Sequence, residues 1–267
     1  MKKFKSIIYL LGIFAMTSSA ALGQEDLRVP LTNPGNPGIL HLSAVFADDI
    51  VIKAHDGNDV IVIFDGNEDD GSGRYSRNGL RRISTNGVGL EVTEDNNEVR
   101  IKTAPNSHDL DLEVWVPKNF SLDIQVTHGD ISIEGVIGEH EVKATNGDVE
   151  MIRVGGSVIV SSVNGDIEVT MVSVIPNTPM SFTGLNGDIE VTFPENTKFT
   201  GKMKTDYGDV FTNFDIKLDR SASASEISSG DGKYTVTVNK WITGTVNGGG
   251  PEFLFKTLHG DKEISKN

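Results

Sequence analysis

The chain has 267 residues, no cysteine, and 38 acidic against 24 basic residues, which gives a formal net charge of −14. A hydrophobic content of 37% together with 29 glycines is low for a helical globule and typical of short strands joined by many turns. The acidic excess argues against binding to nucleic acid and against electrostatic docking on anionic lipid, because both need clustered Lys and Arg.

The N-terminus has the features of a secretory signal peptide over residues 1–23. Three lysines within the first five residues precede an apolar run over residues 7–16, and small residues follow up to Gly23. This order predicts cleavage near Gly23, and the apolar run is shorter than the ~20 residues that a membrane-spanning helix needs. Cleavage would leave 21 basic and 38 acidic residues, a net charge of −17. We therefore expect an exported protein, located in the periplasm, at the cell surface or outside the cell, with no transmembrane anchor and no disulfides.

The mature chain begins with two segments that precede the main repeat. Residues 24–39 are expected to form a flexible exported N-terminus, and residues 40–104 an N-terminal β segment. In that segment, residues 50–53 and 60–64 flank Asp56-Gly57-Asn58, and residues 89–92 and 99–102 flank Asp95-Asn96-Asn97. Each pair of strand-like runs around a turn-forming sequence predicts a β-hairpin. Residues 105–264 form the strand-repeat region, which we expect to be continuous with the preceding segment.

The strand-repeat region is marked by a recurring turn in which Gly-Asp follows an Asn or an aromatic residue. Intervals of 18, 18, 22 and 21 residues separate the markers at 128–130, 146–148, 164–166, 186–188 and 207–209, and His259-Gly260-Asp261 repeats the marker near the end. An apolar residue follows each Asp of the first five markers, then comes a polar residue in most repeats, and then a second apolar one. This alternation of period 2 indicates half-buried strands, and Asn-Gly supplies the positive φ of a tight turn. The fold class is therefore all-β.

Two architectures satisfy this pattern. In a β-solenoid each repeat is one coil, and equivalent residues stack ~4.8 Å apart. In a β-meander or sandwich, Asn-Gly closes hairpins between antiparallel strands. Near-identical side chains at equivalent positions favour the solenoid-like stack. The open ends of such a stack need caps, which the segments before residue 105 and after residue 215 could provide.

With these features, the chain resembles a bacterial family of β-strand-repeat proteins known as an adhesin domain of unknown function. The resemblance rests on Val116-Pro117-Lys118, on the repeated Asn-Gly-Asp-Ile/Val-Glu-Val units and on the closing residues 247–251 and 259–261, and it covers about residues 40–264. It implies an exported, all-β, solenoid-like protein. It supplies no catalytic residues.

The column of marker aspartates is the sharpest candidate site. It consists of Asp130, Asp148, Asp166, Asp188 and Asp209. Stacked carboxylates repel one another by ~1 kcal/mol per pair in water, so turn amides, counterions or bound Ca²⁺ must offset the repulsion. The favoured interpretation is that each Asp caps its own turn, and weak calcium binding is the alternative. Glu150, Glu168 and Glu190 form a second acidic column.

Other candidate sites are weaker. The one basic cluster consists of Arg74, Arg77, Arg81 and Arg82, and it is either a contact for an anion or acidic glycan or a solvated loop. His128 and His259 occupy the Asn position of their markers, which indicates turn residues rather than metal ligands or bases. No nucleotide-binding loop, nucleophile elbow or metal-ligand spacing occurs, so we expect no catalytic residues and no cofactor other than possible Ca²⁺.

Three functions fit these features. The first is a non-enzymatic protein of the cell envelope or surface, with an adhesin-like binding role toward an unknown envelope protein or a polysaccharide. The second is a solenoid enzyme that cleaves polysaccharide with clustered carboxylates. The third is a scaffold stabilised by cations. The first is favoured, because the repeated acids stand at turn positions, whereas a catalytic set usually interrupts a repeat.

Overall fold

The computed structural model describes residues 25–66, 76–77, 80–81, 89–104, 110–219, 225–230, 233–238 and 241–267, so the segment 1–23 assigned to a signal peptide lies outside them. All regular elements in these ranges are strands, and none is a helix that could cross a membrane. The strands are β1 (Glu25–Pro30), β2 (Gly38–His55), β3 (Asp59–Gly66), β4 (Ser76–Arg77), β5 (Leu80–Arg81), β6 (Leu90–Asp95), β7 (Glu98–Thr103), β8 (Leu110–Pro117), β9 (Phe120–Glu134), β10 (Ile137–Asn146), β11 (Val149–Asn164), β12 (Ile167–Val174), β13 (Met180–Asn186), β14 (Ile189–Phe193), β15 (Phe199–Lys204), β16 (Val210–Thr212), β17 (Ile216–Asp219), β18 (Ser225–Gly230), β19 (Lys233–Val238), β20 (Ile242–Val246), β21 (Glu252–Lys256) and β22 (Lys262–Lys266).

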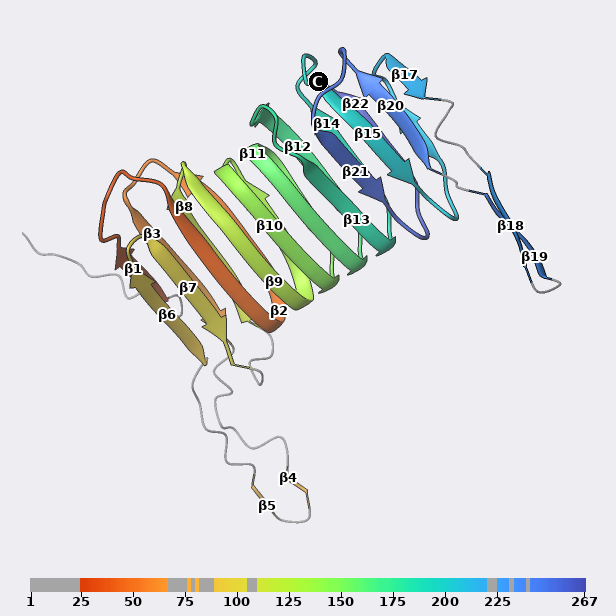
Figure 1. Ribbon diagram of the computed structural model, residues 1–267. Helices are drawn as coiled ribbons and strands as arrows, with labels where there is room; N and C mark the ends of the chain where they lie inside the picture. The colour runs from red at the N-terminus through yellow and green to blue at the C-terminus, as the bar shows by residue number, and fades with distance from the viewer. Residues whose placement is uncertain are drawn as a thin grey trace, which may run out of the picture.

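Successive repeats pair in parallel and build an elongated stack of coils (Figure 1). One sheet contains the first halves of β2 and β9, then β10, the second half of β11, β13, β21 and β15. The other contains the second halves of β2 and β9, the first half of β11, then β12, β14, β22 and β16. Equivalent residues pair in register, as Val142 does with Ile124 and Val160. The β-solenoid-like prediction is confirmed, because a meander would pair its neighbouring strands antiparallel.

The C-terminal strands enter the stack out of chain order. β21 lies between β13 and β15 in one sheet, and β22 lies between β14 and β16 in the other. The last marker, at residues 259–261, therefore stacks between the markers at 186–188 and 207–209. Residues 252–266 therefore belong to the stack itself, and their level in it, out of chain order, was not predicted.

Aromatic packing explains why the C-terminal strands enter at this level. The ring of Phe255 stacks on Phe182 with centroids 5.2 Å apart, and the ring of Phe253 stacks on Phe199 at 4.9 Å. All four side chains are fully buried. Phenylalanines thus fill the core between β13, β21 and β15. Aliphatic residues such as Ile124 and Val142 fill the equivalent positions of earlier coils. Large rings bury more apolar area per residue, which stabilises the inserted coil.

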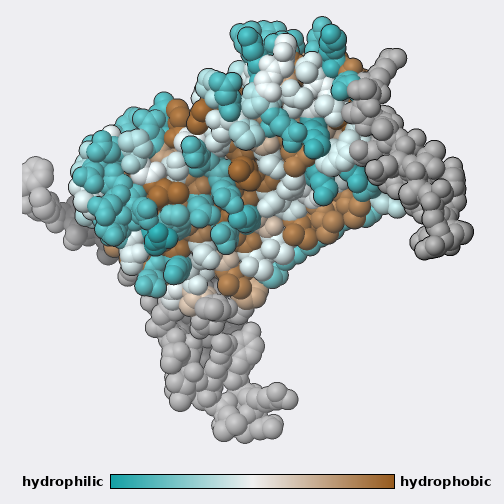
Figure 2. All heavy atoms as spheres, viewed as in Figure 1, coloured by the Kyte–Doolittle hydropathy of each residue, from teal (hydrophilic) through white to brown (hydrophobic). Residues whose placement is uncertain are grey.

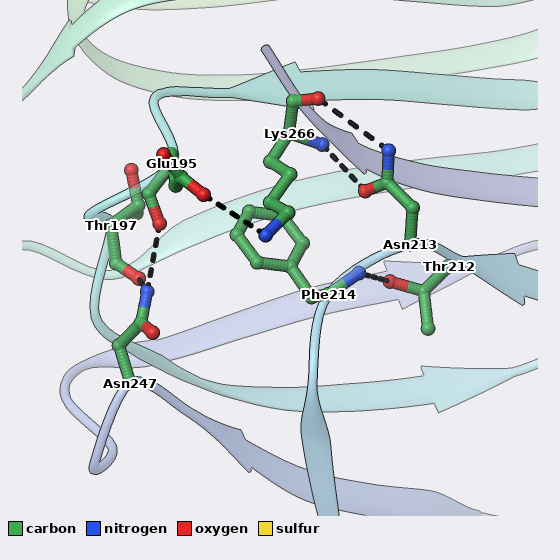
Figure 3. A network of polar contacts seen from close by, with 7 residues as sticks. All are labelled: Glu195, Thr197, Thr212, Asn213, Phe214, Asn247 and Lys266. Carbon is green, nitrogen blue, oxygen red and sulfur yellow. Dashed lines mark hydrogen bonds and ion pairs between the residues drawn. The ribbon is translucent and has the colours of Figure 1, made fainter.

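Antiparallel strands cap the stack at both ends, as predicted. At the C-terminal end β20 pairs with β15 and β17 with β20, and at the N-terminal end β6 pairs with β7 and β3 with β8. Phe214 closes the C-terminal end of the core, with its ring edge-on to Phe199 at 5.7 Å. Figure 3 shows the polar contacts around it, in which Asn213 binds the main chain of Lys266 and the ammonium of Lys266 lies 3.1 Å from Glu195.

Two expectations for the N-terminal region are wrong. The segments before and after Asp56-Gly57-Asn58 do not form a hairpin, because β8 lies between β2 and β3 and pairs with both. The segment 24–39 is not flexible throughout, since Glu25–Pro30 forms β1 along β3. Thr32 then donates to Glu94 through its main-chain N–H at 2.8 Å. The second predicted hairpin is confirmed as β6 and β7, with positive φ at Asn96 and Asn97.

Lys262 interrupts an inward-facing column that is otherwise apolar. It pairs in register with Ile189 on one side and Val210 on the other. The side chain has no exposed surface, and its Nζ has no hydrogen-bond partner among the described residues. Burial lowers the pKa of Lys262 to about 8, although the carboxylates of Asp261 and Asp188 favour the charged form.

Replacing Lys262 with methionine is expected to raise the free energy of unfolding by ~1–3 kcal/mol at pH 7, because an unpaired buried charge is removed at similar side-chain length. The folded pKa of about 8 lies below the ordinary value of 10.5. The free energy of unfolding of the wild type should therefore rise as the pH rises from 8 toward 10.5. The difference in this free energy between the methionine variant and the wild type should shrink over the same range. Urea unfolding at pH 7 and pH 10 measures both effects. A less stable variant at pH 7 would contradict this account.

Candidate functional site

The marker aspartates form a hydrogen-bonded ladder that runs along the stack. The main-chain N–H of Asp148 donates to Oδ1 of Asp130 at 2.8 Å, and that of Asp166 donates to Oδ1 of Asp148 at 2.8 Å. The same contact joins Asp188 to Asp166, Asp261 to Asp188 and Asp209 to Asp261 at 2.7–2.8 Å. Each of these carboxylates except that of Asp209, the last in the stack, accepts the amide of the next coil. The structure therefore brings the five predicted aspartates together and adds Asp261 to them.

The expectation that each Asp caps its own turn is wrong, because amides of the turn already have partners in the neighbouring coil. The N–H of Gly147 donates to the carbonyl of Asn164 at 3.0 Å, and the N–H of Val149 donates to the carbonyl of Asp166 at 2.9 Å. The nearest free donor for Asp148 is thus the amide one coil further along. Charge-assisted hydrogen bonds of this kind offset part of the repulsion between the stacked carboxylates.

A second ladder runs through the first position of the markers. The side-chain amide of Asn164 donates to Asn146 at 3.0 Å, and that of Asn186 donates to Asn164 at 2.9 Å. At the ends of this ladder, the ring of His128 stacks on Phe46 at 4.9 Å and the ring of His259 stacks on Tyr207 at 4.7 Å. His128 lies within β9 next to Gly129, whose φ is +126°, and His259 lies in the segment between β21 and β22. The ladder holds successive turns in one register.

The glutamate column lies two residues beyond the aspartates. Glu150, Glu168 and Glu190 pair in register, and the inserted strand β22 extends the column with Glu263. Partial burial raises the pKa of Glu190, and the carboxylates of Glu263 and Glu168 on either side raise it further. The column is therefore a continuous line of interacting negative charges.

The two acidic columns line one open groove. Its volume is about 410 Å³, and its walls include Asp130, Asp148 and Asp166 from one column, Glu150 and Glu168 from the other, and Asp49 at the end. None of these carboxylates forms an ion pair with Lys or Arg in the described part of the chain. Sequence reasoning found both columns but not the groove, which depends on the distance between them. The groove can attract cations and repel anions.

Calcium binding by Asp130, Asp148, Asp166, Asp188 and Asp209 stays a prediction. Within the described ranges, no three His, Asp or Glu side chains are grouped closely enough to hold a metal ion. One oxygen of each interior carboxylate already accepts an amide, so a cation would have to use the other oxygen. Calorimetric titration of the mature chain with CaCl₂ checks this prediction.

The arginine cluster lies mostly outside the described residues. Arg74 and Arg82 are outside them, and Arg77 and Arg81 belong to the short strands β4 and β5, whose side chains are not described. Their predicted contact with an anion or acidic glycan therefore stays a prediction.

Replacing Asp166 with alanine is expected to lower the free energy of unfolding by ~1–2 kcal/mol, because the amide of Asp188 loses its acceptor. Asp166→Asn should change stability by less than ~0.5 kcal/mol, since an amide oxygen can still accept the bond. Asp209→Ala is the matched control, because Asp209 is the last rung and no described amide donates to its side chain. Equal losses for Asp166→Ala and Asp209→Ala in urea unfolding would contradict the ladder as a source of stability.

A family model matches the central part of this chain. Residues 120–241 match the family model described as "Toastrack DUF4097". That segment of the chain is similar to the Toastrack family. The match covers β9 to β19 and the residues up to Trp241, so the four marker turns of β9–β14 and the turn at 207–209 lie within it. The family resemblance inferred from the strand and turn motifs is thereby confirmed, and the stack extends beyond the matched Toastrack segment at both ends.

Two solved structures match most of this chain's length at low sequence identity. One is described as a "putative cell adhesion protein" from Clostridium sporogenes ATCC 15579, with 13% identity, a TM-score of 0.44 and coverage of 91% of this chain and 99% of that one. The other is described as a "putative adhesin" from Bacteroides fragilis NCTC 9343, with 10% identity, a TM-score of 0.37 and coverage of 92% and 98%. No curated protein matches this chain.

Proposed function

We propose that this protein is exported and acts as a non-enzymatic, adhesin-like binding scaffold at the cell envelope or surface. The observation that carries the proposal is the broad outer face of the solenoid, whose side chains are held in register by hydrogen-bonded turns. The basic, apolar and small residues of segment 1–23 support export. The similarity of residues 120–241 to the Toastrack family is compatible with this role and names no ligand.

The outer face of the first sheet carries features of a binding surface. Ile159 is 49% exposed, Val163 39% and Leu185 42%, and all three belong to the neighbouring strands β11 and β13. Figure 2 shows hydrophobic areas between hydrophilic ones on the visible face. Contiguous exposed apolar side chains are a common feature of interaction sites.

Two measurements test the proposal. Mass spectrometry of the envelope and culture fractions is expected to find a chain that begins near Gln24. Deletion of the gene is expected to reduce attachment of the cells or the amount of a partner retained in the envelope, and the purified chain should restore it. A full-length chain that stays in the cytoplasm would overturn the proposal.

A polysaccharide-cleaving enzyme remains the second candidate, and the acidic groove favours it. Paired carboxylates can act as acid and base or nucleophile in glycoside hydrolysis. The purified chain would then release soluble sugars from a polysaccharide, and Asp148→Asn and Glu150→Gln would abolish the release. Binding without product would favour the scaffold.

A further inference from the structure

Three lysines and a tryptophan gather on the outer face of the C-terminal end of the stack. The Nζ atoms of Lys202 and Lys204, both on β15, lie 5.0 and 5.9 Å from the ring centre of Trp241, which directly precedes β20. On the other side of β15, Lys204 pairs in register with Lys256 of β21. Figure 1 shows β20, β15 and β21 as neighbours at this end. We call Lys202, Lys204, Trp241 and Lys256 the lysine–tryptophan patch.

The charges of the patch are poorly neutralised within the chain. The ammonium of Lys202 is 3.9 Å from Glu252 and that of Lys204 is 3.8 Å from Asp206, both beyond hydrogen-bonding distance. Lys256 is exposed and forms no ion pair with any described residue. Lys53 differs from the lysines of the patch. Its ammonium also lies over a tryptophan ring, that of Trp115, but it donates a hydrogen bond to Glu113 at 2.8 Å and is thereby neutralised. The patch therefore keeps its affinity for an external anion.

Hydroxyl groups flank the patch in two rows that cross four strands. The first row joins Ser181, Leu254, Lys202 and Thr243 in register. The second joins Thr183, Lys256 and Lys204, with Trp241 beyond them. The rows form part of a flat sheet surface that presents ammonium groups, hydroxyls and one indole ring side by side.

We propose that the lysine–tryptophan patch binds an anionic polysaccharide. Ammonium groups pair with its carboxylate or sulfate groups, hydroxyls bond to its hydroxyls, and the apolar body of Trp241 packs against a sugar ring. The net charge of −14 disfavours an anionic membrane or nucleic acid, which would meet the acidic columns as well as the patch. A flexible sugar chain can contact the patch alone. This inference rests on the proposed binding function and names the ligand class.

The test measures binding of the whole mature chain to polygalacturonate, dextran sulfate and neutral dextran by calorimetry. At least one of the two polyanions is expected to bind, and neutral dextran is not. Which of them binds separates carboxylate from sulfate recognition. The triple variant Lys202→Gln, Lys204→Gln, Lys256→Gln should weaken binding at least tenfold, and Trp241→Ala at least threefold. The matched triple variant Lys53→Gln, Lys102→Gln, Lys143→Gln makes the same charge change elsewhere and should weaken binding less than twofold.

Several outcomes would overturn the proposal. These are equal weakening by the two triple variants, no binding to either polyanion, equal binding to neutral dextran, or tighter binding to phosphatidylglycerol vesicles. If the glutamine variant melts at a lower temperature, the corresponding Lys→Arg variant keeps the charges and should bind within threefold of the wild type. A tenfold loss with that variant would also overturn the proposal. Surface location and loss of attachment on gene deletion are separate readouts, so the scaffold role can stand while this ligand class fails.

Discussion

Replacing Gly165 with alanine is expected to lower the free energy of unfolding by ~4 kcal/mol, an exceptional loss for a single methyl group in a turn. Gly165 has a φ of +150°, and a Cβ at this position would lie 2.0 Å from the carbonyl oxygen of Gly147 and 2.5 Å from its carbon. Both atoms belong to main chain held by hydrogen bonds between coils. The clash can be relieved only if the coils separate at this turn, which breaks the aspartate and asparagine ladders there.

Gly248→Ala provides the matched control. Gly248 has a φ of +91°, but a Cβ there would meet no atom within 4 Å. Only backbone strain remains, which costs ~1 kcal/mol. The difference between the two variants in urea unfolding measures the close approach of the coils alone. If both variants lost the same stability, the contact between turn glycines would not constrain the stack.

Stability is expected to fall by up to ~3 kcal/mol as the pH drops from 6.5 to 4, because His140 is held neutral in the core. The side chain is 2% exposed and stands in an inward column between Leu122 and Val158. Burial lowers the pKa of His140 from 6.5 to about 4, although the carbonyls of Gly155 and Val136 favour the charged form. The unfolded chain therefore binds more protons across this range. Above pH 6.5 and below pH 4, the contribution of His140 to the free energy of unfolding should not change with pH.

His140→Leu isolates this contribution, because leucine already fills the neighbouring position at Leu122. At pH 4.5 the variant should be more stable than the wild type by ~2 kcal/mol, and the difference should shrink toward pH 7. Urea unfolding across this pH range gives both curves, and their difference cancels the carboxylates that titrate in the same region. A difference that does not depend on pH would show that His140 becomes charged without penalty in the folded state.

The repeat and the fold class could be predicted because their signals are local. Alternation within each repeat marks the strands, and Asn-Gly marks the turns, where Gly147 and Gly165 have φ of +140° and +150°. The aspartate column followed from the recurrence of the same marker in each repeat. His259-Gly260-Asp261 together with Glu263 repeats the same pattern, so the signal for the sixth rung was present in the sequence.

The level at which each coil stacks could not be predicted, because it depends on contacts between distant segments. Nothing within residues 252–266 shows that Phe253 and Phe255 pack between Phe182 and Phe199. In the same way, no local signal places β8 between β2 and β3. The hydrogen-bond donor of each marker Asp could not be predicted either. Its own turn also offers main-chain N–H groups, and only the neighbouring coil decides which N–H group the carboxylate accepts. The acidic groove and the lysine–tryptophan patch arise from such distant pairings.

The insertion of β21 and β22 has a consequence for how the chain folds during synthesis. Residues 199–212 are made before residues 252–266, yet in the sheets β15 and β16 reach the earlier coils only through those later strands. The coil formed by β15 and β16 therefore cannot pair with the earlier coils until residues 252–266 have been made. Closing the long loop between these segments slows folding. Deletion of residues 252–266 would remove β21 and β22 together and leave β15 and β16 without their pairing to the earlier coils.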